Sequence, residues 1–252
     1  MGRKKGKQPE RSPPDWPSWE PEWLSASDPE TMCKILGGLE YEAGYQTSTR
    51  KLRLFTVACL YRIRHVFNDE RTSGLVGALE QVADDVITME EFERMEAQAS
   101  HPPNEDARDP DQDCPPAKRP AACGCSALGF ASAPALDWWQ TYVSAHWARD
   151  AAGEELTERQ IQATILRELF GNPFRPVSLD PAWRTPTVTA LATIAYEERT
   201  LPAATLDIDR LAVLADALED AGSDNADILS HLRDPGPHVR GCWALDLILG
   251  RE

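Results

Sequence analysis

The sequence lacks any run of about 18 apolar residues, the minimum for a membrane-spanning helix. Its basic start, MGRKKGKQPERSPPD, leads into a polar, proline-rich stretch where a secretory signal needs an apolar segment. Gly6 stands where a myristoylation motif has Ser or Thr. We therefore expect a cytoplasmic protein with no membrane partner, in which the six cysteines are reduced thiols.

Positive charge is also scarce. The chain has 26 Lys and Arg against 41 Asp and Glu, a formal net charge of −15 at pH 7. Such a field repels nucleic acid, which makes nucleic acid an unfavoured partner and another protein the expected one. Solubility is the simplest interpretation of the charge, and the oligomeric state stays open.

Sequence motifs of the common enzyme classes are missing: there is no GxGxxG, P-loop, GxSxG, HExxH or kinase set. The glycines of RTSGLVGALE lie within a helical pattern and follow no strand. The sequence therefore predicts no catalytic residue and no cofactor. It favours a non-enzymatic protein-interaction or adaptor module.

What the sequence does contain is helix signals, and no segment has a convincing strand pattern. We predict an all-α, multi-helix bundle in two helical parts. Residues 1–19 form a disordered basic, proline-rich arm, and residues 20–100 form an N-terminal helical bundle. Residues 101–130, which include HPPNEDARDPDQDCPPAKRP, form a linker or disordered insertion. Residues 131–252 form a C-terminal helical domain.

Individual residues refine this outline. Thr88 with Glu91 predicts a capping box, and Thr185 predicts a helix that begins at Pro186. Gly37 and Gly38 predict the end of a short helix. Trp16, Trp19 and Trp23 have helical spacing, and they form either an aromatic peptide ligand or, as we favour, anchors that pin the arm to its own domain.

Metal-ligating residue types gather in SDNADILSHLRDPGPHVRGCW, residues 223–243. By spacing, a four-ligand metal site could be closed by Asp227, His231, His238 and Cys242. With Asp224, the same stretch supports the alternative function, a metal-dependent hydrolase or nuclease. The stretch lacks the CxxC spacing of zinc sites, so we favour a turn between two helices and predict no metal.

Other polar residues in the sequence suggest weaker sites. Arg53, Arg62 and Arg64 lie opposite an apolar helix face, where they form a solvated surface or, alternatively, bind an anionic partner. Cys114, Cys123 and Cys125 are read as thiols of a variable loop, with a soft-metal site as the alternative.

The last helix, expected from about His238, is apolar nearly all round. It is therefore predicted to be central in the C-terminal part, with Trp243 buried and His231 peripheral. Asp246 is expected to be half-buried and paired with Arg240, His238 or Arg233.

Several blocks of the chain resemble a large family of uncharacterised bacterial proteins that is abundant in planctomycetes. The most specific blocks are FGNPFRP and GPHVRGCW; SWEPEWLSASDPETMCKIL and RKLRLFTVACLYRIRHVFNDER also match. LAVLADALEDAGSDNADIL is weakly similar to the repeat-companion domain, with Ala217 where that motif has tryptophan. The resemblance implies a cytoplasmic bacterial protein and assigns no catalytic residue.

Overall fold

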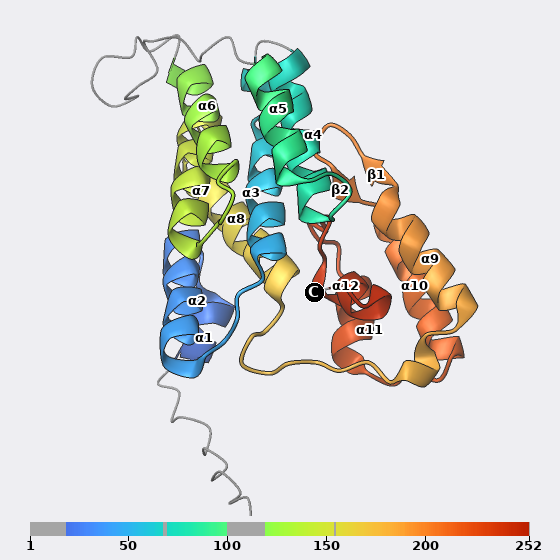
Figure 1. The fold of residues 1–252 in the computed structure, drawn as a ribbon. Helices are drawn as coiled ribbons and strands as arrows, with labels where there is room; N and C mark the ends of the chain where they lie inside the picture. The colour runs from blue at the N-terminus through green and yellow to red at the C-terminus, as the bar shows by residue number, and fades with distance from the viewer. Residues whose placement is uncertain (1–18, 68–69, 100–118, 154, 252) are drawn as a thin grey trace, which may run out of the picture.

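The computed structural model describes residues 19–67, 70–99, 119–153 and 155–251. These residues confirm the all-α class (Figure 1). The α-helices are α1 (Trp19–Ser25), α2 (Pro29–Ala43), α3 (Thr49–Arg62), α4 (Glu70–Ala83), α5 (Met89–Ala99), α6 (Arg119–Ala131), α7 (Trp138–Ala152), α8 (Glu155–Phe170), α9 (Pro186–Glu197), α10 (Ile208–Asp220), α11 (Ala226–Leu232) and α12 (Trp243–Leu249). None of these helices is long and apolar enough to cross a membrane.

One short strand pair departs from the prediction of no strands. β1 (Arg199–Thr200) and β2 (Thr205–Leu206) form a two-stranded antiparallel sheet between α9 and α10. Thr205 also forms a bridge to Val239, in the loop that precedes α12. Through this bridge, the loop before α12 is hydrogen-bonded to the strand pair between α9 and α10.

Helix α3 is the centre of the larger of two hydrophobic clusters. It contacts α4, α6, α7 and α8, and every residue from Leu52 to Tyr61 is buried. Buried apolar residues lie on several sides of the helix, since Leu54 and Val57 point away from Leu52, so α3 has no solvated face over this stretch. The first cluster comprises residues of α1–α8 and of the adjoining loops, and it also includes Ala204 between β1 and β2 and Val239 in the loop before α12.

Glycines in α2 serve close packing and do not end the helix. The predicted end at Gly37 and Gly38 is wrong, since α2 continues to Ala43. A Cβ at Gly37 would lie 2.8 Å from Trp138 Nε1, and one at Gly38 would lie 2.7 Å from the Trp19 ring. The two glycines therefore admit two indole rings against the helix. The capping box of Thr88 and the cap of α9 by Thr185 are confirmed.

The predicted linker over residues 101–130 is corrected at its C-terminal end, because residues 119–131 form α6, which packs against α7. Cys123 is buried on α6 and Cys125 is half-buried there, so neither belongs to a loop. Cys114 and the rest of the predicted linker lie outside the described residues, as do Trp16 and the predicted arm up to residue 18. Trp19 and Trp23 pack into the first cluster, as predicted.

The second cluster contains α9–α12, so the cores separate after α8 and not at residue 131. Its centre is formed by leucines of α10 and by Leu245 and Ile248 of α12. α12 begins at Trp243 instead of near His238. Trp243 is only half-buried, because it lies at the N-terminal end of α12 with its ring against Gly171.

The two clusters are joined by a buried ionic group around Asp84. Arg50 binds Asp84 (Nε–Oδ1 2.9 Å) and Asp246 (Nη1–Oδ2 2.7 Å), and Arg240 binds Asp84 (Nε–Oδ2 2.6 Å). The Tyr196 hydroxyl lies 2.9 Å from both Asp84 oxygens. Asp246 is therefore an ion-paired carboxylate, as predicted, but it is fully buried and its partner is Arg50 on α3.

Candidate functional site

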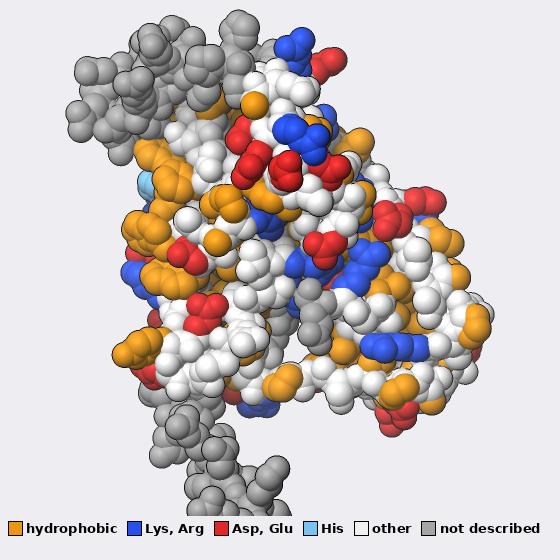
Figure 2. Space-filling view, viewed as in Figure 1, with side chains coloured by type: hydrophobic (Ala, Val, Ile, Leu, Met, Phe, Trp, Pro, Cys, Tyr) orange, Lys and Arg blue, Asp and Glu red, His pale blue; other side chains and the backbone are white. Residues whose placement is uncertain are grey.

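A groove of about 1080 Å³ lies between the two clusters. Figure 2 shows the molecule hollowed between the part built on α1–α8 and the part built on α9–α12. Its walls come from α1, the turn before α3, the end of α8 with the segment that follows, α11 and α12. The apolar lining side chains are Leu24, Tyr45, Phe170, Val177, Trp243 and Leu247.

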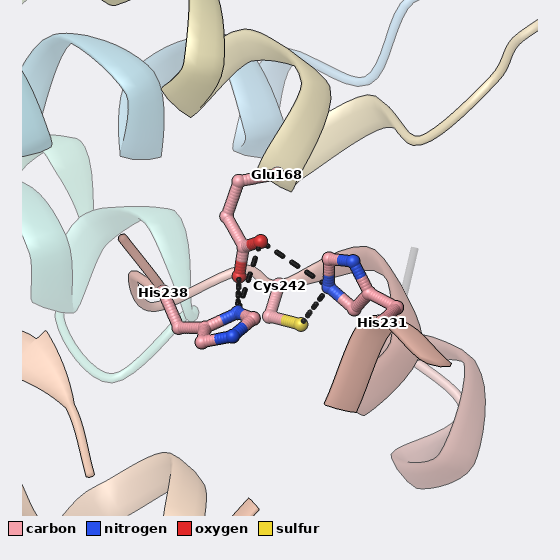
Figure 3. A group of neighbouring side chains, drawn as sticks. All are labelled: Glu168, His231, His238 and Cys242. Carbon is pink, nitrogen blue, oxygen red and sulfur yellow. Dashed lines mark hydrogen bonds and ion pairs between the residues drawn. The ribbon is translucent and has the colours of Figure 1, made fainter. Parts of the chain in front are cut away.

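Four side chains with metal-ligating atoms converge around Glu168 (Figure 3), and one of them, His231, lines the groove. Glu168 comes from the last turn of α8, His231 from the last turn of α11, and His238 and Cys242 from the loop before α12. One ligand atom of each lies within 4.8 Å of the other three. The Glu168 site, as we call these four residues, thus joins α8 of the first cluster to α11 and to the loop before α12, whose Cys242 belongs to the second cluster.

The carboxylate of Glu168 is the hub of the site. His238 Nδ1 lies 3.0 and 3.1 Å from its two oxygens, and His231 Nε2 lies 3.2 Å from Oε2. The same His231 nitrogen is 3.2 Å from the sulfur of Cys242. Glu168, His238 and Cys242 are buried, whereas the side chain of His231 is 18% exposed and lines the groove. His231 is therefore the side of the site that faces the groove.

Both ring nitrogens of His238 face hydrogen-bond acceptors. Nε2 lies 2.9 Å from the backbone oxygen of Asp234, and Nδ1 faces the Glu168 carboxylate. A carbonyl oxygen and an ionised carboxylate only accept hydrogen bonds. The geometry is satisfied when the imidazole carries both protons, when Glu168 is protonated, or when a cation takes the place of the Nδ1 proton.

The electrostatics of the site follow from burial and from these contacts. Burial opposes the charge on Glu168, but hydrogen bonds from His231 and His238 outweigh it and hold the Glu168 pKa below its usual value. Burial likewise opposes a charge on His238, and the contact with Glu168 outweighs it and raises the His238 pKa. Burial, reinforced by the Glu168 carboxylate, raises the pKa of the Cys242 thiol well above its usual range. Without a cation the thiol is therefore protonated.

The loop that carries His238 and Cys242 is held by backbone contacts. The Leu206 N–H donates to the His238 carbonyl (2.9 Å), and the Cys242 N–H donates to the Val239 carbonyl (3.0 Å). Gly241 has φ +88°, and a Cβ there would lie 2.6 Å from a methyl carbon of Leu54 on α3. Only glycine combines a positive φ with the absence of a Cβ at this contact. Gly241 therefore lets the GPHVRGCW segment pack directly against α3.

Three of the four residues predicted as a metal site are brought together: His231, His238 and Cys242. Asp227 is not part of the group; it lines the groove. The interpretation of this stretch as a simple turn missed this convergence, because the fourth member, Glu168, is about sixty residues away in the chain. A signal for Glu168 existed: it follows Ile165 by three residues and Ile161 by seven, which places a carboxylate on an apolar helix face.

The predicted arginine surface is corrected by the structure. Arg53 is buried and donates to the carbonyls of Ala131 and Ala133 at the end of α6 (3.0 Å each). Arg62 makes a two-pronged contact with buried Glu158. Arg64 is half-buried in the turn after α3. Arg53 and Arg62 make their contacts within the first cluster because α6 and α8 cover the face of α3 that was expected to be solvated.

Comparison of the chain with models of protein families, with curated proteins and with solved structures finds no match. The function must therefore be argued from the groove and the Glu168 site themselves.

Proposed function

We propose that the protein is a non-enzymatic binding module that holds an extended segment of another protein in the groove between its two clusters. The groove's volume, about 1080 Å³, is the observation that supports this most directly. Pockets for small ligands usually enclose about 300–1000 Å³. An open groove slightly larger than this range, lined by separate apolar side chains, suits a chain with anchors spaced along it.

The segment after α8 offers backbone groups to such a chain. Pro173, Pro176 and Val177 line the groove, and prolines keep this segment extended. Within the described residues, the backbone N–H of Val177, which lines the groove, donates to no protein acceptor. An extended peptide pairs with free backbone groups of this kind while its side chains enter neighbouring pockets.

The groove is lined by charges of both signs, with Lys51, Arg167, Arg175 and Arg251 as well as Glu20, Asp227, Asp234 and Asp246. Beside α11 the carboxylates suit a basic anchor of the occupant. Asp227 and Asp234 line the groove, and neither forms a salt bridge within the described residues. The chain as a whole carries a formal charge of −15. Lys or Arg side chains beside apolar anchors would therefore be attracted to this wall and would speed association.

The chemistry beside the groove supports binding over covalent catalysis. Cys242, the thiol next to His231, is fully buried, and burial raises its pKa well above the usual range. A thiol that stays protonated is a poor nucleophile.

Selection from a phage-displayed library of random peptides, on the immobilised full chain, tests the proposal. We expect the selected peptides to combine Leu, Ile or aromatic residues with Lys or Arg. Binding of the synthetic peptides, measured by fluorescence anisotropy, should weaken about tenfold or more in Leu247→Asp and in Asp227→Lys, as loss of a central contact implies. Trp139→Ser alters a tryptophan that is exposed on α7, outside the groove, and serves as the matched control.

Two results would overturn the proposal. In the first, no peptide is enriched, or the groove variants bind as well as the Trp139→Ser control. In the second, a synthetic peptide of residues 2–15 of this chain, which is basic and proline-rich, competes with every selected peptide at lower concentration. The groove would then serve the chain's own N-terminal segment and not a partner.

The second candidate, a metal-dependent hydrolase, is favoured only by the Glu168 site. The donor set suits a metal, but the structure encloses three of its four residues, and a catalytic metal needs an open coordination position. For hydrolysis, a substrate and a water molecule would have to reach a metal at the Glu168 site from the groove, past the side chain of His231.

A further inference from the structure

The donor atoms of the Glu168 site match one class of ion. Two imidazole nitrogens, a thiol sulfur and a carboxylate oxygen together are typical ligands of Zn²⁺, whereas Ca²⁺ and Mg²⁺ prefer oxygen alone. Zinc bonds of about 2.0–2.3 Å in a tetrahedron place neighbouring donors roughly 3.3–3.8 Å apart. Three pairs of donor atoms are 3.0–3.2 Å apart, slightly closer than this spacing, and all four donor atoms lie within 4.8 Å of one another. Adjustments of about an ångström in the side chains would bring the four donors to this spacing.

The orientation of His238 supports a cation independently of the donor types. Its Nε2–H is committed to the Asp234 carbonyl at 2.9 Å, which directs the Nδ1 lone pair of the neutral ring toward Glu168. A histidine that ligates a metal almost always donates its other N–H to a carbonyl or carboxylate in this way. The hydrogen bond to Asp234 is therefore the outer contact expected of a ligand.

The arrangement of the site within the fold indicates a structural role. Glu168 belongs to the first cluster, and His231, His238 and Cys242 belong to segments that pack in or beside the second. Glu168, His238 and Cys242 are each at most 5% exposed. Structural zinc sites are closed four-ligand sites of this kind, and they contribute directly to folding free energy.

We propose that Glu168, His231, His238 and Cys242 bind one Zn²⁺ ion, which clamps α8 to α11 and to the loop before α12. Binding releases the thiol proton of Cys242 and any proton on His238 to solvent, leaving a thiolate, a carboxylate and two neutral imidazoles around the ion. The competing arrangement is metal-free: a protonated His238 paired with Glu168, beside a neutral thiol. The zinc site is independent of the peptide-binding proposal, so either can fail alone.

Metal analysis of the purified full chain by plasma mass spectrometry is the direct test. We expect about one zinc ion per chain after dialysis against zinc and then against metal-free buffer. Cys242→Ser and His238→Gln should each lose most of this zinc. Cys59→Ser is the matched control, because Cys59 is an equally buried thiol outside the site. Its zinc content should equal that of the native chain.

Cobalt provides a spectroscopic test on the native sequence. The chelated chain titrated with Co²⁺ should develop the near-ultraviolet band of a cobalt–thiolate bond and the strong visible bands of a tetrahedral ion. Both should saturate at one equivalent and persist in Cys59→Ser. His231→Gln, which alters the most exposed of the four residues, should weaken binding at least tenfold while circular dichroism shows a native helix content.

Chelation should also lower the melting temperature of the native chain by about 10 °C, the shift expected for loss of a tightly bound ion from a chain of this size. The proposal is overturned if the native chain retains no zinc and gives no thiolate band with Co²⁺. It is equally overturned if Cys242→Ser binds zinc as Cys59→Ser does. Should Cys242→Ser fail to fold, the cobalt titration of the native chain decides the question.

Discussion

Two buried polar groups lie between the same two hydrophobic clusters, and they are built differently. Around Asp84, cations and anions alternate: Arg50 lies between Asp84 and Asp246, and Arg240 contacts Asp84 from the other side. Around Glu168, one carboxylate faces two imidazoles and a thiol, none of which carries a permanent positive charge. In the first group, arginines supply permanent cations, whereas in the second the positive charge comes either from a protonated His238 or, as we propose, from a bound Zn²⁺ ion.

Breaking the Asp84 group should have the largest effect on stability. Arg50→Met leaves Asp84 and Asp246 buried without their shared cation, and loss of one partner of a buried pair costs about 3–5 kcal/mol. Urea denaturation of the full chain measures this cost. The matched control is Arg233→Met, whose partners Asp216 and Glu219 are exposed, so its cost should stay under about 1 kcal/mol. Similar costs for the two variants would show that the Asp84 group contributes little.

Glu168→Gln tests whether the second group differs as described. In chelated protein the amide keeps an acceptor for His238 and removes a buried charge, so the free energy of unfolding should fall by only about 1–3 kcal/mol. In zinc-loaded protein the cost should be larger, because the variant also loses the metal ligand. Both costs are measured by urea denaturation. If they are equal, the Glu168 site, like the Asp84 group, is stabilised by the chain's own side chains without a metal.

A third comparison concerns Trp243 and His231, whose rings are 4.8 Å apart. The sequence predicts a severe loss for Trp243→Ala and almost none for His231→Ala. In the structure Trp243 is only half-buried, whereas His231 contacts both Glu168 and Cys242. The two substitutions should therefore cost similar amounts of stability. We expect both variants to lose about 1–3 kcal/mol in thermal melts, and Ile248→Ala, which opens a cavity in the second cluster, to lose about 2–5 kcal/mol. A Trp243→Ala loss above that of Ile248→Ala would restore the original prediction.

Local patterns in the sequence predict the helices well and the contacts between them poorly. The caps at Thr88 and Thr185 depend on residues within a few positions of each other, and the structure has them. The face of α3 depends on which helices pack around it, and no spacing within α3 reveals that α6 and α8 cover Arg53 and Arg62.

The Glu168 site shows the same limit. Its three C-terminal members are visible as one motif, since they lie within twelve residues of each other. The member on α8 becomes a neighbour only when the two clusters dock, and Gly241 permits the close approach to Leu54 and Leu169 that brings it there. A prediction restricted to one stretch of sequence therefore took Asp227 as the fourth ligand, whereas the fourth residue of the group is Glu168.

The last comparison, whose effect appears only at alkaline pH, sets a thiol inside the first cluster against the thiol of the Glu168 site. Burial raises the pKa of Cys33 to about 12. Because the folded pKa lies above the unfolded one, Cys33 contributes stability that is fully present below about pH 8.5 and is lost as the pH rises toward 12. Relative to Cys33→Ala, the native chain should therefore lose up to about 1.4 kcal/mol more per pH unit above pH 9, as measured by urea denaturation at several pH values. Cys59 is buried in the same cluster and is present in both proteins, so its contribution does not affect the difference between them.

The thiol of the Glu168 site should behave differently. In zinc-loaded protein Cys242 is already a thiolate, so Cys242→Ala should leave the dependence of stability on pH above pH 9 unchanged. If the native chain instead loses stability more steeply than Cys242→Ala, Cys242 carries a proton and no metal is bound there.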